Sequence, residues 1–229
     1  MTDRPSASAS SRPIPPAQRN GLLDEPGPVK TSRWPRTSRR QERIDDVLGR
    51  RQPSLTIVLE DVHDQWNASA VLRSCDAVGV LDVHLVYVND PPPRKAFDRK
   101  TSGSAAKWVA LHTHTSIETC YEYLRERGFT IFASALRADS QDVYEVNFRQ
   151  PTALVLGNEK RGVSDLAADW ADGTYLIPMH GMVESLNISV ACAVSLYEAL
   201  RQRRAAGMYE TPGLGPDALG QMREEWLRK

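Results

Sequence analysis

Long apolar runs, disulfide-type cysteine patterns and a net charge are all missing from this sequence of 229 residues. No stretch approaches the roughly 20 consecutive apolar residues of a membrane span, and the N-terminus lacks the apolar core of a signal peptide. The three cysteines, Cys75, Cys120 and Cys192, lie far apart and form no CxxC pair. This spacing favours reduced thiols over a disulfide framework or a zinc site. We therefore expect a cytoplasmic protein with no membrane segment and no bound metal.

The net charge is zero because 29 basic side chains balance 29 acidic ones. A protein that binds nucleic acid by bulk electrostatics is usually strongly basic, so any such contact must be local. One segment is locally basic and includes a tryptophan, whose flat ring is suited to stacking on a base. Such a run is either an RNA-binding surface or a solvated helix face. The candidate RNA-binding residues are Arg33, Trp34, Arg36, Arg39, Arg40 and Arg43.

Composition divides the chain into four parts. Residues 1–30 are rich in Pro, Ser and Ala without an apolar period, which is typical of a disordered extension. Residues 31–52 form the basic segment, in which a helix is expected from about residue 38 to residue 51, ending near Gly49. Residues 53–206 form the main domain, and residues 207–229 form a C-terminal tail or helix.

The main domain alternates apolar strands with amphipathic helices. Strands are predicted over 55–59, 83–88, 130–134, 153–156 and 174–177, and helices over 68–78, 116–127 and 186–204. This alternation predicts an α/β fold with a parallel sheet that carries helices on both faces. Such sheets bind ligands at the carboxyl ends of their strands. We therefore expect the chemistry in the loops after Leu59, Ser134, Leu156 and Ile177.

The common nucleotide-binding motifs are not found. No GxGxxG follows a strand, and the glycines of GLGPDALG (213–220) have the wrong spacing. The segment GNEKRG (157–162) has the GxxxxG spacing, but Val163 and Ser164 follow where a phosphate-binding loop has Lys and then Ser or Thr. These failures argue against NAD and ATP and indicate an α/β protein with a different cofactor.

A first informative segment is NASAVLRSCDAVG, residues 67–79. It has the pattern of an amphipathic helix. Asn67 stands at its start, where it is either a simple N-cap or part of a site. Arg73 and Asp76 share one face, as an exposed ion pair or as functional groups.

Two further segments follow predicted strands. LVLGNEKRGVS (154–164) holds Glu159 just beyond a strand, either as a loop carboxylate paired with Lys160 or Arg161, or as a site residue. IPMHGMVESLNISVACAVSLY (177–197) ends a strand and opens a helix that carries a stripe of small residues. That stripe is either plain core or the border of a ligand site.

In this order the three segments resemble the signature motifs of the SpoU/TrmH branch of the SPOUT RNA 2'-O-ribose methyltransferases. The similarity runs from about Arg40 to the C-terminus, and the final segments EALRQRRAAGMY and EEWLRK resemble the members that methylate guanosine 18 of tRNA. The resemblance implies S-adenosyl-L-methionine as methyl donor and tRNA as substrate. It also implies a deep C-terminal trefoil knot that binds the donor, and a homodimer whose active site draws on both chains. Periodicity alone indicates no knot, and true knots are rare.

Residue by residue, the resemblance implies a catalytic set and a donor-binding set. The expected catalytic residues are Arg73, Asn67, Glu159, Ser185 and Asn187. The expected donor-binding residues are Ser134, Leu156, Gly157, Ile177, Met179 and Leu186. The sequence departs from the family at Arg161 and His180, which stand where the family has apolar or aromatic residues. The N-terminal extension is also longer than the family pattern.

The chemistry leaves two interpretations of Arg73 open. A ribose hydroxyl must lose its proton to accept a methyl group, so the site needs a base or a group that stabilises the incipient alkoxide. Arg73 is either that base, although deprotonating arginine is costly, or a charged group that holds phosphate and stabilises the alkoxide. We favour the second. The alternative functions are 2'-O-methylation of ribosomal RNA and RNA binding without catalysis.

Overall fold

One parallel sheet organises the chain. The computed structural model describes residues 37–88 and 105–229, and within these residues the sheet has seven strands in the order β3-β2-β1-β6-β4-β7-β5. The strands are β1 (Leu55–Glu60), β2 (Asp82–Val86), β3 (Ala110–His114), β4 (Thr130–Ser134), β5 (Gln141–Asp142), β6 (Thr152–Leu156) and β7 (Gly173–Leu176). The predicted α/β class with a parallel sheet is confirmed.

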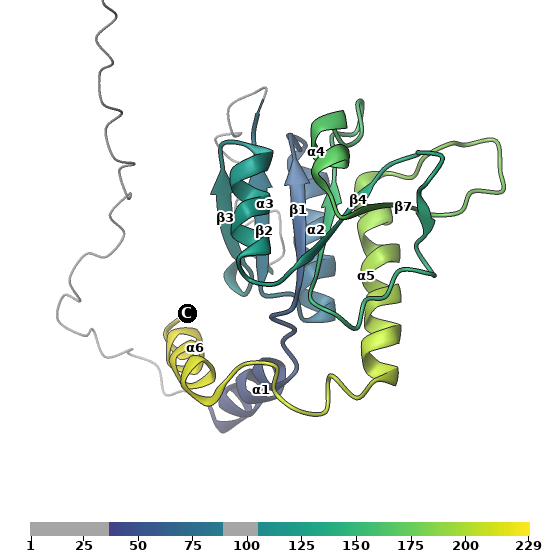
Figure 1. The fold of residues 1–229 in the computed structure, drawn as a ribbon. Helices are drawn as coiled ribbons and strands as arrows, with labels where there is room; N and C mark the ends of the chain where they lie inside the picture. The colour runs from purple at the N-terminus through teal and green to yellow at the C-terminus, as the bar shows by residue number, and fades with distance from the viewer. Residues whose placement is uncertain (1–36, 89–104) are drawn as a thin grey trace, which may run out of the picture. The chain divides into compact units, whose positions relative to one another are not determined.

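The helices lie on both faces of the sheet, as Figure 1 shows. Helices α2 and α5 cover one face, and α3 and α4 cover the other. The helices are α1 (Ser38–Gly49), α2 (Gln65–Val78), α3 (Ile117–Arg125), α4 (Asp165–Trp170), α5 (Ile188–Ala205) and α6 (Pro216–Arg228), and a 3-10 turn, η1, spans Ala105–Lys107. Every residue of β1 and β6 is buried because these strands are covered on both faces. No helix of the described part is long and apolar enough to cross a membrane.

Five predicted strands correspond to β1, β2, β4, β6 and β7, whereas β3 and β5 were not predicted. β3 is an edge strand whose residues are exposed or only partly buried, so it has no apolar run to recognise. β5 has only two residues. The short helix α4 was also missed, although Ser164 caps it by accepting a hydrogen bond from the Ala167 amide.

The first signature segment forms helix α2, and the structure excludes one of the two alternatives left open for Asn67 and one of the two left open for Arg73 and Asp76. The N-cap is Asp64, which accepts a hydrogen bond from the backbone amide of Asn67, so Asn67 lies inside the first turn. Asp76 pairs with the fully buried guanidinium of Arg51, not with Arg73. Arg51 also donates to the Val80 carbonyl, and these bonds tie the start of the main domain to the end of α2.

Helix α5 is held by a buried arginine near its C-terminal end. The Arg203 guanidinium is fully buried and donates to the carbonyl oxygens of Ser54, Phe148 and Gln150. It also reaches the side chains of Gln52 and Ser54. One residue therefore joins α5 to the segment before β1 and to the segment that enters β6.

Helices α1 and α6 pack together through Ile44 and Leu48 of α1 and Trp226 and Leu227 of α6. They lie at the amino end of the strands, as Figure 1 shows, away from the loop that follows β7. The Arg223 guanidinium on α6 pairs with the Asp45 carboxylate on α1 through two hydrogen bonds.

Candidate active site

A cavity of about 480 Å³ opens at the carboxyl ends of β4, β6 and β7. Its walls are the segment after β4, the loop after β6, and the segment between β7 and α5. All six predicted donor-binding residues line it, namely Ser134, Leu156, Gly157, Ile177, Met179 and Leu186. The expectation that ligand-binding loops follow Ser134, Leu156 and Ile177 therefore agrees with the position of the cavity.

The loop after β6 is built around a close approach of its own backbone. Asn158 and Gly162 form an antiparallel bridge, with the Gly162 amide donating to the Asn158 carbonyl at 2.7 Å. A Cβ atom on Gly157 would lie 2.1 Å from backbone atoms of Gly162 and Val163. Gly162 has φ +70, in the left-handed region that favours glycine. The two glycines therefore fix the shape of this wall of the cavity.

Two acidic residues at the end of β1 anchor the same loop. The buried Glu60 carboxylate accepts hydrogen bonds from the amide and the hydroxyl of Ser164. The Asn158 side chain donates to the Asp61 carbonyl at 2.8 Å, and the Arg161 guanidinium lies 3.5 Å from the Asp61 carboxylate. Arg161, one of the departures from the family pattern, thus has a carboxylate partner at the border of the cavity.

The three signature segments meet in a chain of hydrogen bonds. The Asn67 side-chain NH₂ group donates to the Glu159 carboxylate at 2.9 Å. The Asn187 side-chain NH₂ group donates to the side-chain oxygen of Asn67, Oδ1, at 3.0 Å. Asn187 also caps α5 by accepting from the Ser189 amide. Glu159 therefore bonds across the sheet end to α2, which favours the site residue over the loop carboxylate paired with Lys160 or Arg161.

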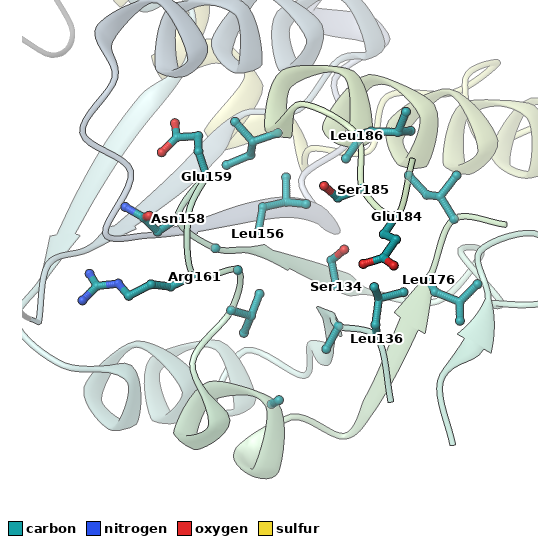
Figure 2. A pocket seen from close by; sticks show the side chains of 18 of the residues that line it. Ser134, Leu136, Leu156, Asn158, Glu159, Arg161, Leu176, Glu184, Ser185 and Leu186 are labelled. Atoms are coloured by element: carbon teal, nitrogen blue, oxygen red, sulfur yellow. The ribbon is translucent and has the colours of Figure 1, made fainter. Parts of the chain in front are cut away.

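Glu159 and Ser185 line the cavity, and so does Glu184, which the sequence did not single out. Figure 2 shows Glu184 beside Ser134, while Glu159 and Arg161 lie on the side of the cavity away from Leu176. Three of the predicted catalytic residues, Asn67, Glu159 and Asn187, thus form one connected group next to the cavity.

Tyr175 is a further cavity residue that the sequence did not indicate. It lies buried on β7, and its hydroxyl is 3.2 Å from the Ser195 hydroxyl of α5. Burial raises the pKa of this phenol, so it is neutral and acts as a hydrogen-bonding group. A buried apolar-looking strand residue gives no local signal of such a role.

Arg73 lies apart from this group. It is exposed on α2, does not line the cavity, and has no ion pair among the described residues. Six residues separate it from Asn67 along the helix, which corresponds to about 9 Å of helical rise. Within one chain, the cavity and the predicted catalytic arginine are therefore separate.

The predicted RNA-binding segment is only partly described. Arg33, Trp34 and Arg36 lie outside the described residues, whereas Arg39, Arg40 and Arg43 are exposed on α1. Arg43 lies 3.5 Å from Asp46, one turn along the helix. His180 is exposed in the segment after β7.

Comparison with known proteins places this geometry in a family. Residues 54–197 match the model of the SpoU rRNA Methylase family. The chain is 50% identical over 194 residues to the tRNA (guanosine(18)-2'-O)-methyltransferase of Thermus thermophilus, covering 85% of this chain and 98% of that protein.

Two solved structures have the same fold. The A. aeolicus TrmH/SpoU tRNA modifying enzyme superimposes with a TM-score of 0.76 at 36% identity, covering 82% of this chain and 94% of the other. An AdoMet-bound rRNA methyltransferase from Sinorhizobium meliloti has a TM-score of 0.58 at 25% identity, covering 71% and 60%. Together with the three converging segments, these matches show that the chain belongs to the SpoU methylase family.

Proposed function

We propose that this protein transfers a methyl group from S-adenosyl-L-methionine to the ribose 2'-hydroxyl of guanosine 18 in tRNA. The observation that carries the proposal is the hydrogen-bonded chain Glu159–Asn67–Asn187, which brings three distant segments to the border of one strand-end cavity. The Thermus thermophilus relative supports the choice of tRNA over ribosomal RNA, because nearly all of its length is matched at 50% identity.

The cavity fits the methyl donor in size and in chemistry. Its volume of about 480 Å³ lies within the range of pockets that bind small molecules. Apolar side chains such as Leu156 and Leu186 stand beside the hydroxyls of Ser134 and Ser185, so a flat apolar ring and a polar sugar both find partners. When bound, the donor supplies the methyl group and a sulfonium leaving group. We assign its binding to Ser134, Leu156, Gly157, Ile177, Met179 and Leu186.

We propose that a second copy of the chain completes the site. Arg73 is exposed on the face of α2 that also carries Trp66, one heptad earlier, and the adjacent helix α5 exposes Val190 and Tyr197 at the same spacing. Exposed apolar side chains on two packed helices are typical of an interface. A homodimer through this face brings Arg73 of one protomer to the cavity of the other, which accounts for its distance from the cavity within one chain.

We also propose that the C-terminal half is threaded as a trefoil knot. The strand order supports this, because β7 lies between β4 and β5. The segment between β5 and β6 bonds to α5 through Val146 and Phe148. The positions of α4 and α5 on opposite faces support a passage of the chain through the loop that β4, β5 and β6 enclose.

In this proposal Arg73 acts as a charged group, and Asn67, Glu159 and Asn187 position the reacting nucleotide and the start of α5. An exposed arginine on a partner chain is suited to binding a phosphate, because its planar fork makes two parallel hydrogen bonds. The same charge stabilises the alkoxide that develops as the hydroxyl loses its proton.

The test is methyl transfer to a tRNA transcript by the wild type and by Arg73→Ala. We expect transfer to fall at least about 100-fold while donor binding persists. Arg73→Lys recovers little activity at any pH if the charged fork is needed, but recovers activity with rising pH if a base is needed. Arg204→Ala, an exposed arginine near the end of α5, serves as the control.

The substrate is tested with a transcript that carries 2'-deoxyguanosine at position 18. Methylation must disappear with this transcript. Persistent transfer to it, or preferential transfer to ribosomal RNA, would contradict the tRNA assignment. Donor binding without transfer to any RNA would show a relative that has lost catalysis.

A further inference from the structure

A cluster of histidines lies at the edge of the sheet formed by β3, which is the edge farther from the cavity. His84 on β2 is paired in register with His112 on β3, and His114 follows two residues later. Side chains two residues apart on a strand point to the same face, and here that face is covered by α3. Cys120 of α3 lies buried in the core of this face. Four potential metal ligands therefore gather from three elements.

Three of these side chains converge closely. The Nδ1 atom of His84 lies 3.0 Å from the Nε2 atom of His114, and one ligand atom from each of His84, His114 and Cys120 lies within 4.8 Å of the other two. His84 and Cys120 are buried, whereas His114 is partly exposed. The cluster thus has a buried floor and an open side.

From this geometry we propose that His84, His114 and Cys120 bind one zinc ion. Two imidazole nitrogens and one thiolate are ligands that zinc prefers, at about 2.0–2.1 Å for nitrogen and about 2.3 Å for sulfur. A tetrahedral ion needs its ligands roughly 3.3–3.8 Å apart at these bond lengths, so the side chains must rotate from their present spacing, which is 3.0 Å between the two nitrogens and at most 4.8 Å within the group, when the ion binds. The open side beside His114 leaves the fourth position to water. The composition-based expectation of no metal site rested on cysteine spacing alone.

Neighbouring side chains restrict the ligand rings. The His112 ring stacks on His84 with centroids 4.9 Å apart, and its Nε2 lies 2.7 Å from the Asp82 carboxylate. His112 is not one of the three proposed ligands, so this pair acts on the site only by holding the ring that stacks on His84. Tyr123 borders all three histidine rings. The Arg127 guanidinium covers Tyr123 and opposes a cation, whereas the Asp82 carboxylate favours one.

Burial keeps the two imidazoles in the form that binds metal but disfavours the thiolate that the ion requires. Burial lowers the pKa of His84 to about 3 and also lowers that of His114, so both imidazoles are neutral, which is the form that binds metal. Burial raises the pKa of Cys120 to about 12, so the thiol keeps its proton until the ion displaces it to solvent. With no ion, the two rings share a hydrogen bond and the thiol is inert.

The proposed zinc ion has a structural role, because β2 and β3 are separated by β1 from the strands that border the cavity. A zinc ion there joins α3 to the edge strand β3, which otherwise contributes few buried side chains. Metal loading should therefore change the stability of the protein and leave donor binding in the cavity unaltered.

The experiment is a cobalt titration of the full-length protein after removal of metal with a chelator. We expect one equivalent of Co²⁺ to bind, with d–d bands of tetrahedral type and a near-ultraviolet thiolate-to-cobalt band, and Zn²⁺ to displace it. Cys120→Ser should abolish the thiolate band, and His114→Gln should weaken binding by about 100-fold. His112→Gln removes the ring that stacks on His84 and should weaken binding less than His114→Gln does.

The matched control is Cys192→Ser, which removes a buried thiol of α5 outside the cluster. This variant must keep the thiolate band and the wild-type affinity. If Cys120→Ser fails to fold, as checked by circular dichroism, the partly exposed His114 supplies the decisive variant. Absence of the thiolate band in the wild type, or cobalt binding that Cys120→Ser and His114→Gln leave unchanged, overturns the proposal.

Discussion

Gly157→Ala tests whether the loop after β6 is a fixed wall of the donor cavity. A Cβ atom at this position would lie 2.1 Å from the backbone carbon and oxygen of Gly162 and from the backbone nitrogen of Val163. Unlike a side-chain end, these atoms cannot rotate away. The loop must therefore move by roughly 1 Å before the new methyl group reaches an acceptable contact distance.

The size of the effect follows from what the loop holds. It carries Glu159 on one side and is fastened to Glu60 through Ser164 on the other, so it cannot shift without breaking these bonds. Overpacking of this kind costs about 1–3 kcal/mol of stability. Misplacing reacting groups by about 1 Å costs on the order of 100-fold in rate. We expect donor affinity to fall at least about 10-fold, which corresponds to about 1.4 kcal/mol.

Isothermal titration with S-adenosyl-L-methionine measures the affinity, and single-turnover methylation measures the rate. Gly181→Ala is the matched control, since it lies between β7 and α5, in the segment that forms another wall, and a Cβ atom there meets nothing within 4 Å. It should bind the donor as the wild type does. Donor affinity within twofold of the wild type in Gly157→Ala would refute the view that the backbone contact shapes the cavity.

Three further predictions concern RNA binding, stability and acid sensitivity. Replacing Arg39 and Arg40 by Gln should weaken tRNA binding and lower the slope of log affinity against log salt by about 2, whereas an unchanged slope would identify a solvated helix face. Asp76→Ala leaves the fully buried guanidinium of Arg51 without its carboxylate and should cost about 2 kcal/mol in urea unfolding. Hydrogen bonds from the Arg201 guanidinium lower the pKa of Glu198 in the folded protein. The Glu198 carboxylate therefore contributes stability above its unfolded pKa, and this contribution is lost as the pH falls through its folded pKa. Glu198→Gln should flatten the acid loss of stability below about pH 4.5.

Two exposed acidic residues provide the controls for the stability predictions. Asp46→Ala removes a surface carboxylate paired with Arg43 and Arg50 and should change stability by less than about 0.5 kcal/mol. Glu224→Gln removes an exposed carboxylate of α6 and should leave the acid profile as it is in the wild type. A loss for Asp46→Ala equal to that for Asp76→Ala would show that burial of the partner has no influence.

The local sequence pattern predicted an element correctly where that element is long and apolar. It failed where the element is stabilised by neighbouring elements. β1 and β6 are buried throughout and were recognisable as apolar runs. The edge strand β3 consists largely of polar residues and is held by its pairing with β2. This pairing is not evident from the residues of β3 alone. The N-cap of α2 stayed undecided because Asp64 and Asn67 are both good capping residues, and only the backbone geometry distinguishes them.

The site shows the same division. The six expected donor-binding residues were named from the family resemblance, and the strand pattern placed the loops after Ser134, Leu156 and Ile177 at the cavity that they line. The hydrogen-bond partner of Glu159 could not be predicted. This partner, Asn67, lies 92 residues away in the chain, whereas two cations follow Glu159 directly in the sequence. The histidine cluster combines residues 30 positions apart on adjacent strands with a cysteine of α3, so no spacing motif marks it.

The buried guanidinium of Arg203 has a consequence for the order in which the chain assembles. The carbonyl oxygens that it binds belong to Ser54, Phe148 and Gln150, all of which leave the ribosome before α5 is made. All three acceptors lack this donor until synthesis has passed residue 203. The Ser54 and Gln150 carbonyls also accept from Thr152, so the missing donor matters most at the Phe148 carbonyl. The segment that enters β6 therefore completes its hydrogen bonds only when the last helix of the main domain docks.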